Sequence, residues 1–220
     1  MLSFAVKNFS MKMIFTAALL LFIGIVHAQN IPVELMAGNA YLNYQHSIHR
    51  KTSAGSRFGW THITNMVNRY QTNTIKGGRP NEMMNQGYFT AMIHPKITIM
   101  GGFFYTPVTD VKLSIATQFA HKTKNWFMIL SPRFDAGKKN SYELFGLLEY
   151  QPALTTRTKL YSRFQFMTNH GNDGHNRSYQ QLRIGIDKKA IQFGIGITVD
   201  QYGPTTEITT NSGVFIRKLI

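Results

Sequence analysis

The chain of 220 residues contains no cysteine. This absence excludes a disulfide framework and any metal site that needs thiolate ligands. Long hydrophobic runs are also lacking after the N-terminal region, because every apolar stretch is broken within a few residues. A helix needs about 20 consecutive apolar residues to cross a bilayer. The sequence therefore predicts no transmembrane helix in the body of the chain.

Acidic residues are scarce. The sequence has 10 Asp and Glu against 24 Lys and Arg, which gives a formal net charge of +14. Such a surplus favours an anionic partner. The basic residues are scattered along the sequence rather than grouped in one stripe, which argues against nucleic acid and favours anionic lipid phosphates.

What the chain has instead is a period-two alternation of apolar and polar residues that restarts repeatedly from Val33 to the C-terminus. The clearest example runs from Ile191 to Asp200, where alternate residues are apolar: Ile191, Phe193, Ile195, Ile197 and Val199. This pattern predicts an all-β protein. The apolar face would meet a second sheet in a soluble sandwich, or lipid in a transmembrane barrel.

The N-terminus resembles a secretory signal peptide. Lys7 and Lys12 precede an apolar stretch from Met13 to Val26, and Val26-His27-Ala28 fits a small-residue cleavage site. The apolar stretch is too short for a membrane anchor. We therefore expect residues 1–28 to be removed on export, leaving residues 29–220 as one domain.

Charged residues on the faces opposite the apolar ones decide between the two architectures. Burying an isolated charge costs several kcal/mol, so a sandwich core could not absorb so many. A hydrated lumen can, by pairing acids with bases on neighbouring strands. The sequence therefore predicts a lumen charge network of Lys112, Glu143, Glu149, Lys159, Arg163, Arg183, Asp187 and Asp200.

With one apolar and one ionic face per strand, the chain resembles the outer-membrane β-barrels of Gram-negative bacteria. Its final segment, Gly213 to Ile220, looks like a barrel-closing strand, although it ends on Ile220 rather than on an aromatic residue. The resemblance implies an antiparallel up-and-down transmembrane barrel in the outer membrane. It also implies outer-membrane lipids, including lipopolysaccharide phosphates, and the barrel-assembly machinery as partners.

The alternation predicts about 10 strands, with about 12 as the next alternative. The first expected strand runs from Val33 to Ile48 and places Met36, Ala40, Leu42 and Tyr44 on one face. The preferred count treats Gly87 to Tyr105 as one bent strand. The alternative makes His94-Pro95-Lys96 a turn and requires a further strand near one terminus.

The strand count also decides where the connections lie. With the lower count, the segments Asn169–Ser178 and Tyr202–Asn211 face outward and Lys188-Lys189 forms a periplasmic turn, but the long loop Gln71–Asn85 faces the periplasm. With the higher count, the long loop faces outward.

One segment carries candidate chemistry. Asn169 to Asn176 contains His170, Asp173 and His175, but their spacing matches no standard zinc site and suits an exposed loop. We expect no metal, no cofactor and no catalytic site. The exceptions worth testing are His170 or His175 with Ser178, because some outer-membrane barrels are lipid A deacylases or phospholipases that use a histidine-activated serine.

Three functions therefore compete. The first is a small barrel with a largely filled lumen, which serves as a structural or interaction protein or as a narrow passive channel for small solutes. The second is an outer-membrane lipid-modifying hydrolase. The third, a soluble exported lipocalin-like binder, is disfavoured by the charged inward faces.

Overall fold

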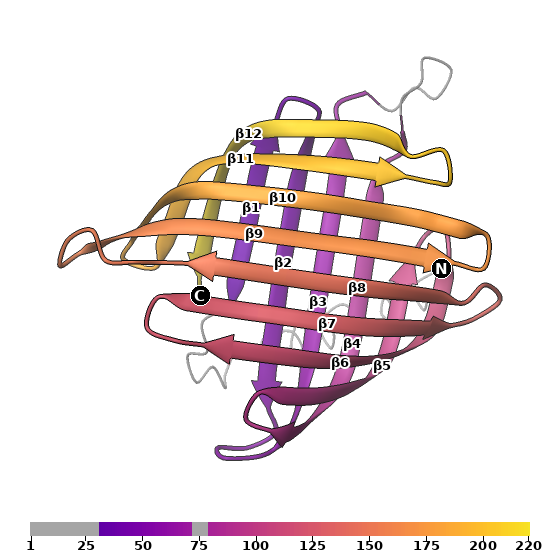
Figure 1. Cartoon of the computed structure of the whole chain (residues 1–220), viewed down its shortest axis with the longest axis horizontal. Coiled ribbons are helices and arrows are strands. Elements are labelled where there is room, and N and C mark those ends of the chain that lie inside the picture. Colours follow the sequence, from indigo (N-terminus) through magenta and orange to yellow (C-terminus); the bar gives the residue numbers. More distant parts are fainter. Residues whose placement is uncertain (1–30, 72–78) are drawn as a thin grey trace, which may run out of the picture. The chain divides into compact units, whose positions relative to one another are not determined.

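The computed structural model describes residues 31–71 and 79–220, and the expected signal peptide lies outside them. In this part of the chain no helix is long and apolar enough to cross a membrane. The strands, shown in Figure 1, are β1 Pro32–Gly38, β2 Tyr41–Lys51, β3 Phe58–Arg69, β4 Glu82–His94, β5 Ile97–Thr106, β6 Asp110–Lys122, β7 Trp126–Ala136, β8 Ser141–Tyr150, β9 Thr158–Gly171, β10 Gly174–Lys188, β11 Ile191–Tyr202 and β12 Glu207–Leu219.

The strands form one closed sheet. Each strand pairs antiparallel with its sequence neighbours, and β1 pairs with β12 from Pro32 opposite Leu219 to Gly38 opposite Gly213. Closure leaves no unpaired strand edge. Figure 1 shows the strands at the front crossing those at the back steeply, which is the tilt that a barrel requires. The expected all-β, antiparallel up-and-down barrel is confirmed.

The preferred strand count is wrong, and the alternative of twelve strands is correct. Two segments expected as single strands are hairpins. The first is broken at Asn39 and Ala40, and His94-Pro95-Lys96 forms the turn between β4 and β5. Proline cannot donate to the strand ladder, which explains the second break.

The first break also exchanges the inward and outward faces that were expected for β1. Leu35 is 40% exposed and lies opposite Tyr44, so both point outward, whereas Met36 points into the barrel and is fully buried. The expectation that Met36 shares a face with Leu42 and Tyr44 is therefore wrong. Gly38 and Tyr41 both face inward although they are three positions apart. The two-residue turn between them therefore shifts the alternation of inward and outward residues by one position.

The barrel has two distinct ends. We call the end that carries Pro32 and Leu219 the terminal end; it also carries the connections at residues 52–57, 95–96, 123–125, 151–157 and 189–190. The distal end carries the connections at residues 39–40, 70–81, 107–109, 137–140, 172–173 and 203–206. The described ends of the long loop, at Gln71 and Arg79, therefore lie at the distal end, as the twelve-strand alternative requires.

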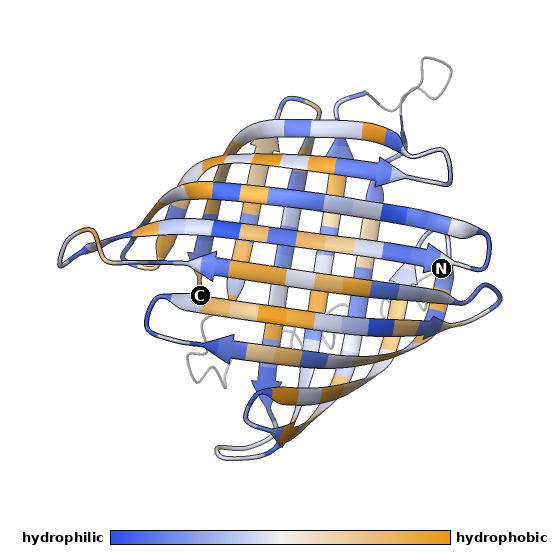
Figure 2. Cartoon of the chain, viewed as in Figure 1, coloured by the Kyte–Doolittle hydropathy of each residue, from blue (hydrophilic) through white to orange (hydrophobic). Residues whose placement is uncertain are grey.

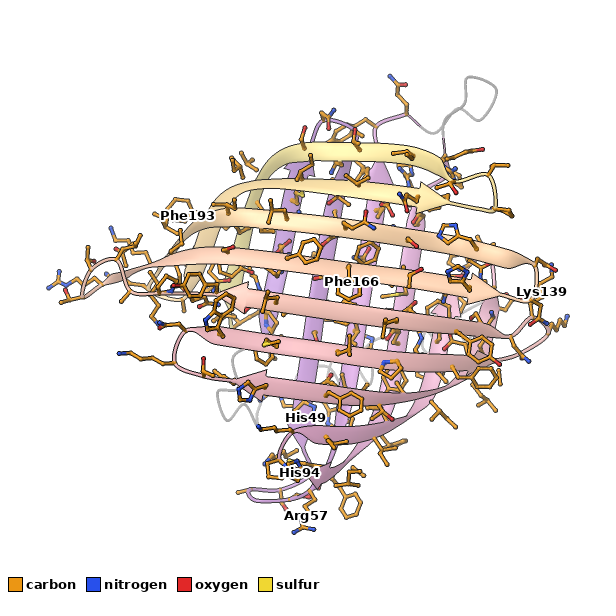
Figure 3. The ribbon with its side chains drawn as sticks, in the orientation of Figure 1. His49, Arg57, His94, Lys139, Phe166 and Phe193 are labelled. Carbon is orange, nitrogen blue, oxygen red and sulfur yellow. The ribbon has the colours of Figure 1, made fainter. Side chains whose placement is uncertain are left out.

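The outward face is apolar along nearly every strand. Figure 2 shows the alternation of hydrophobic and hydrophilic residues, and Leu113, Ile195 and Val214 are 73%, 67% and 61% exposed. Phe193, labelled in Figure 3, belongs to this face and is 44% exposed. Such exposure is far beyond what a soluble monomer tolerates over a continuous surface.

Side chains fill much of the interior. Met36, Tyr161 and Phe215 form a buried apolar cluster from β1, β9 and β12. Beside it, a Cβ on Gly196 would lie 2.6 Å from Cδ of Arg183, which is fully buried. Glycine at this position therefore makes room for a large charged side chain in the lumen.

Candidate functional sites

The eight residues of the predicted lumen network all lie at inward-facing positions of the sheet register. Lys112, Glu149, Arg163, Arg183 and Asp200 are buried there, and the Glu143 side chain is 9% exposed. Asp187 is half-buried and accepts a hydrogen bond from Gln192. Lys159, opposite Asp187 in the register, is exposed near the terminal end.

Two acids in the half of the lumen nearer the terminal end organise what we call the terminal network: Glu34, Glu149, Arg163, Arg183 and Arg217. Oε1 of Glu34 accepts from Nη2 of Arg163 at 2.7 Å and from Nε of Arg183 at 3.2 Å. Oε1 of Glu149 accepts from Nη1 of Arg217 at 2.8 Å. Three guanidinium groups therefore share two carboxylates, and the network carries a surplus positive charge.

A second group near the distal end, the distal network, consists of Arg69, Glu82, Arg177, Asp200 and Tyr202. Glu82 accepts from Nη2 of Arg69 at 2.5 Å and from Nη1 of Arg177 at 2.8 Å. Arg177 also donates through Nε to Asp200 at 2.9 Å. Tyr202 donates its hydroxyl to Glu82 at 2.8 Å.

The distal network crosses the lumen. Glu82 lies on β4 and Arg177 on β10, and these strands are diametrically opposite in the order of the barrel. A direct bond between opposite walls leaves little free cross-section at that level. The arrangement can therefore constrict the lumen and join its two sides.

A third group, the wall network, stays on neighbouring strands. Arg133 on β7 donates to Asp135 at 3.0 Å and to Glu143 on β8 at 2.7 Å. Asp135 also accepts from the hydroxyls of Ser114 and Ser141. Because these partners lie side by side on the barrel wall, they stabilise the sheet without crossing the lumen.

Sequence reasoning missed several members of these networks: Glu34, Arg69, Glu82, Arg133, Asp135, Arg177 and Arg217. Arg133 and Asp135 flank the outward Phe134, so the alternation alone could have placed them inside. Glu34 could not be found that way. The turn at Asn39 and Ala40 shifts the alternation between β1 and β2, and a single continuous strand would place Glu34 on the outward face.

The residues considered for metal binding do not converge. Asp173 pairs with Lys139 at 2.6 Å in the distal turns, and its carboxylate raises the pKa of the Lys139 ammonium group. His170 and His175 contact each other edge to face with ring centroids 5.2 Å apart. Among the described residues no group of three or more acidic, histidine or cysteine side chains could hold a metal ion.

The histidine and serine considered for catalysis do lie together. Nε2 of His175 is 2.8 Å from Oγ of Ser178, and Nδ1 of His175 is 2.8 Å from the carbonyl oxygen of Gly203. A carbonyl oxygen only accepts, so Nδ1 carries the proton and the Nε2 of a neutral ring is an acceptor. A neutral His175 ring can therefore take a proton from Ser178, although in the structure the hydroxyl of Ser178 donates to Oγ1 of Thr168.

This pair lies on the outward face near the distal end. Ser178 stands opposite Thr168, which stands opposite the outward Leu144. Oγ of Ser178 donates to Oγ1 of Thr168 at 2.8 Å, and Ser178 is 8% exposed. The serine therefore lies beside a histidine but is largely covered.

The sequence matches no protein-family model and no curated protein. Among solved structures, the chain is similar to the NanC porin with a TM-score of 0.54 at 9% identity, covering 87% of this chain and 98% of that one. It is also similar to the KdgM porin in complex with disordered oligogalacturonate, with a TM-score of 0.50 at 11% identity, covering 86% and 98%. At such identities the likeness concerns the fold, and at that level the resemblance to porin-like outer-membrane β-barrels is confirmed.

Proposed function

We propose that the protein is an integral outer-membrane β-barrel that serves as a narrow passive channel for small solutes. The closed sheet, the exposed apolar outward face and the ionic interior support this proposal. The likeness of the fold to two porins supports it as well. In this arrangement the terminal end faces the periplasm and the distal end faces outward.

The observation that carries the proposal is the bond between Glu82 and Arg177 across the lumen. It constricts the passage without a plug domain, and small solutes pass only beside it. Among the lumen positions described above, basic side chains exceed acidic ones by one: Arg69, Lys112, Arg133, Lys159, Arg163, Arg177, Arg183 and Arg217 against Glu34, Glu82, Asp135, Glu143, Glu149, Asp187 and Asp200. The channel therefore has a mild preference for anions.

Recording from single barrels in planar bilayers tests the proposal. We expect low conductance for the native protein and higher conductance for the double variant Glu82→Ala and Arg177→Ala. The matched control, Arg133→Ala and Glu143→Ala, removes an ion pair that follows the wall, so conductance stays low. Equal conductance in all three proteins contradicts a constriction at the distal network, and no conductance in any of them favours a purely structural role.

Two partners belong to the same proposal. The closing strand β12 pairs with both β1 and β11, and its outward residues Val214 and Ile216 are exposed. We assign its recognition to the barrel-assembly machinery. Lipopolysaccharide phosphates would meet the basic residues of the distal turn at residues 137–140.

A second candidate, a lipid-modifying hydrolase, is favoured by the contact between His175 and Ser178. In such a reaction Oγ of Ser178 attacks the carbonyl carbon of an acyl ester while its proton passes to Nε2 of His175. The C–O bond of the ester then breaks as the leaving alcohol takes that proton, and water releases the fatty acid from Ser178. The carbonyl oxygen of Gly203 holds the ring and stabilises the imidazolium that forms. The position on the outward face suits acyl chains of the surrounding lipid.

Release of fatty acid from phospholipid or lipid A in mixed micelles tests this candidate. We expect Ser178→Ala to lower the rate by at least about 10³-fold. Ser162→Ala is the matched control, because Ser162 is also outward but stands opposite Tyr150. The absence of hydrolysis in the native protein, or an equal loss in both variants, eliminates the hydrolase.

A further inference from the structure

Basic residues scattered through the sequence gather at one end of the barrel. Each of the five connections at the terminal end carries an exposed lysine or arginine, and β12 adds one more near its end. We call these six residues the basic collar: Arg57, Lys96, Lys124, Arg157, Lys189 and Lys218. In the described part of the chain none of them forms an ion pair.

The acidic side chains nearest to the collar in sequence point into the lumen and not toward the collar. Glu149 and Asp187 lie close to terminal-end turns in sequence, but both face the lumen. There Glu149 pairs with Arg217, and Asp187 accepts from Gln192. The positive charge of the collar is therefore not neutralised by its neighbours.

The distal end differs. Arg79 pairs with Glu207, and Lys139 pairs with Asp173. Figure 3 shows Arg57 close to His94 at one corner of the barrel, with Lys139 far from them at another side. Among the described residues, unpaired positive charge is thus concentrated at the terminal end, although Lys138 at the distal end also forms no ion pair.

Outward aromatic side chains adjoin the collar. Trp126 follows Lys124 by two residues and stacks on Tyr150 with ring centroids 4.3 Å apart. Phe58 follows Arg57 and is 64% exposed. Aromatic rings beside lysine and arginine at the border of an apolar belt are the arrangement found where a membrane surface meets water.

We propose that the basic collar binds the phosphate groups of anionic phospholipids in the leaflet at the terminal end. The inference rests on the proposed membrane-embedded barrel. The collar encircles the barrel, because each turn at the terminal end carries at least one of its charges. It directly borders the apolar outward face. That geometry fits a ring of lipid headgroups, whereas an acidic protein would need the charges on one side. The collar thereby fixes the depth of the barrel in the membrane.

The experiment uses the full mature chain in vesicles of phosphatidylcholine with added phosphatidylglycerol, solubilised gently for native mass spectrometry of bound lipid. We expect enrichment of phosphatidylglycerol on the native protein that falls as salt rises. The double variant Lys96→Gln and Lys124→Gln should lower this enrichment roughly three- to tenfold. The control, Arg79→Gln and Glu207→Gln, removes an exposed ion pair from the distal end without changing the net charge, and it should leave the enrichment unchanged.

Three outcomes overturn the proposal. One is equal enrichment on the native protein and the collar variant. Another is an equal loss in the collar and distal variants. A third is salt-sensitive binding of soluble polyglutamate without enrichment of phosphatidylglycerol, which would assign the collar to an acidic polymer.

Unboiled gel migration of each sample separates these results from a failure of the proposed function. A heat-modifiable band in the vesicle fraction shows an inserted barrel, so a missing lipid preference then refutes the collar alone. If the native protein never enters vesicles, the membrane-embedded barrel and the collar proposal fall together.

Discussion

Individual charged residues contribute unequally to the stability of the barrel. Glu34 is 1% exposed and serves two guanidinium groups, while Glu207 pairs with Arg79 at the surface, where its side chain is 68% exposed. Removing one partner of a buried ion pair leaves an uncompensated charge, whereas an exposed pair contributes little. The same chemical change therefore has very different consequences at the two positions.

We expect Glu34→Gln to lower the free energy of unfolding by about 3–5 kcal/mol, because Arg163 and Arg183 lose their shared carboxylate. Glu207→Gln should change it by less than about 1 kcal/mol. Urea unfolding of the refolded barrel, followed by tryptophan fluorescence, measures both. Equal effects would mean that the terminal network is hydrated and weak.

Gly196 is a second sensitive residue. We expect Gly196→Ala to destabilise the barrel by about 1–3 kcal/mol, because its Cβ would lie 2.6 Å from Cδ of the fully buried Arg183. Gly101→Ala is the control, since no atom lies within 4 Å of the added Cβ. Thermal unfolding of both variants measures the difference, and a neutral Gly196→Ala would show that Arg183 moves freely.

At the scale of elements, side chains from one strand hold the turn of another. Oδ1 of Asn211 on β12 accepts from the backbone amides of Ala40 and Tyr41, and its Nδ2 donates to the carbonyl of Tyr41. Asn39 accepts in turn from the amide of Ser212. The turn that ends β1 is therefore fixed by tertiary contacts rather than by a strong local turn sequence.

Asn211→Ala should lower the free energy of unfolding by about 1–3 kcal/mol, because the amides of Ala40 and Tyr41 and the carbonyl of Tyr41 lose a partner. Ser212→Ala is the neighbouring control, since Ser212 binds Asn39 only through its backbone. Chemical unfolding compares the two variants. If Ser212→Ala were equally destabilising, the turn would not depend on the Asn211 side chain.

At the scale of the whole molecule, closure between β1 and β12 governs stability. A barrel whose ladder has no free edge resists detergent until it is boiled. We expect the unboiled protein from the outer-membrane fraction to migrate differently from the boiled protein on a denaturing gel. Deleting Gly213–Ile220 removes the pairing to β1 over its length and should abolish the shift. A shift that survives the deletion, or native protein in the soluble fraction, would contradict a closed membrane barrel.

The alternation by itself determined the fold class and most faces, because a period of two is a local property of extended chain. From β6 to β11 the outward residues are those that the alternation predicts, from Leu113 to Val199. It also placed Lys112, Arg163 and Arg183 on the inner side. These assignments need no knowledge of which strands meet.

Only the tertiary structure decided the strand count, the partners in the lumen and the gathering of basic residues at the terminal end. The turn at Asn39 and Ala40 depends on Asn211, which lies far along the sequence. Glu82 meets Arg177 only because closure brings β4 opposite β10. His175 and Ser178 are near in sequence, yet the protonation of Nδ1 in His175 depends on the carbonyl of Gly203 in another turn. Contacts between distant segments depend on how the sheet closes, and no local pattern encodes them.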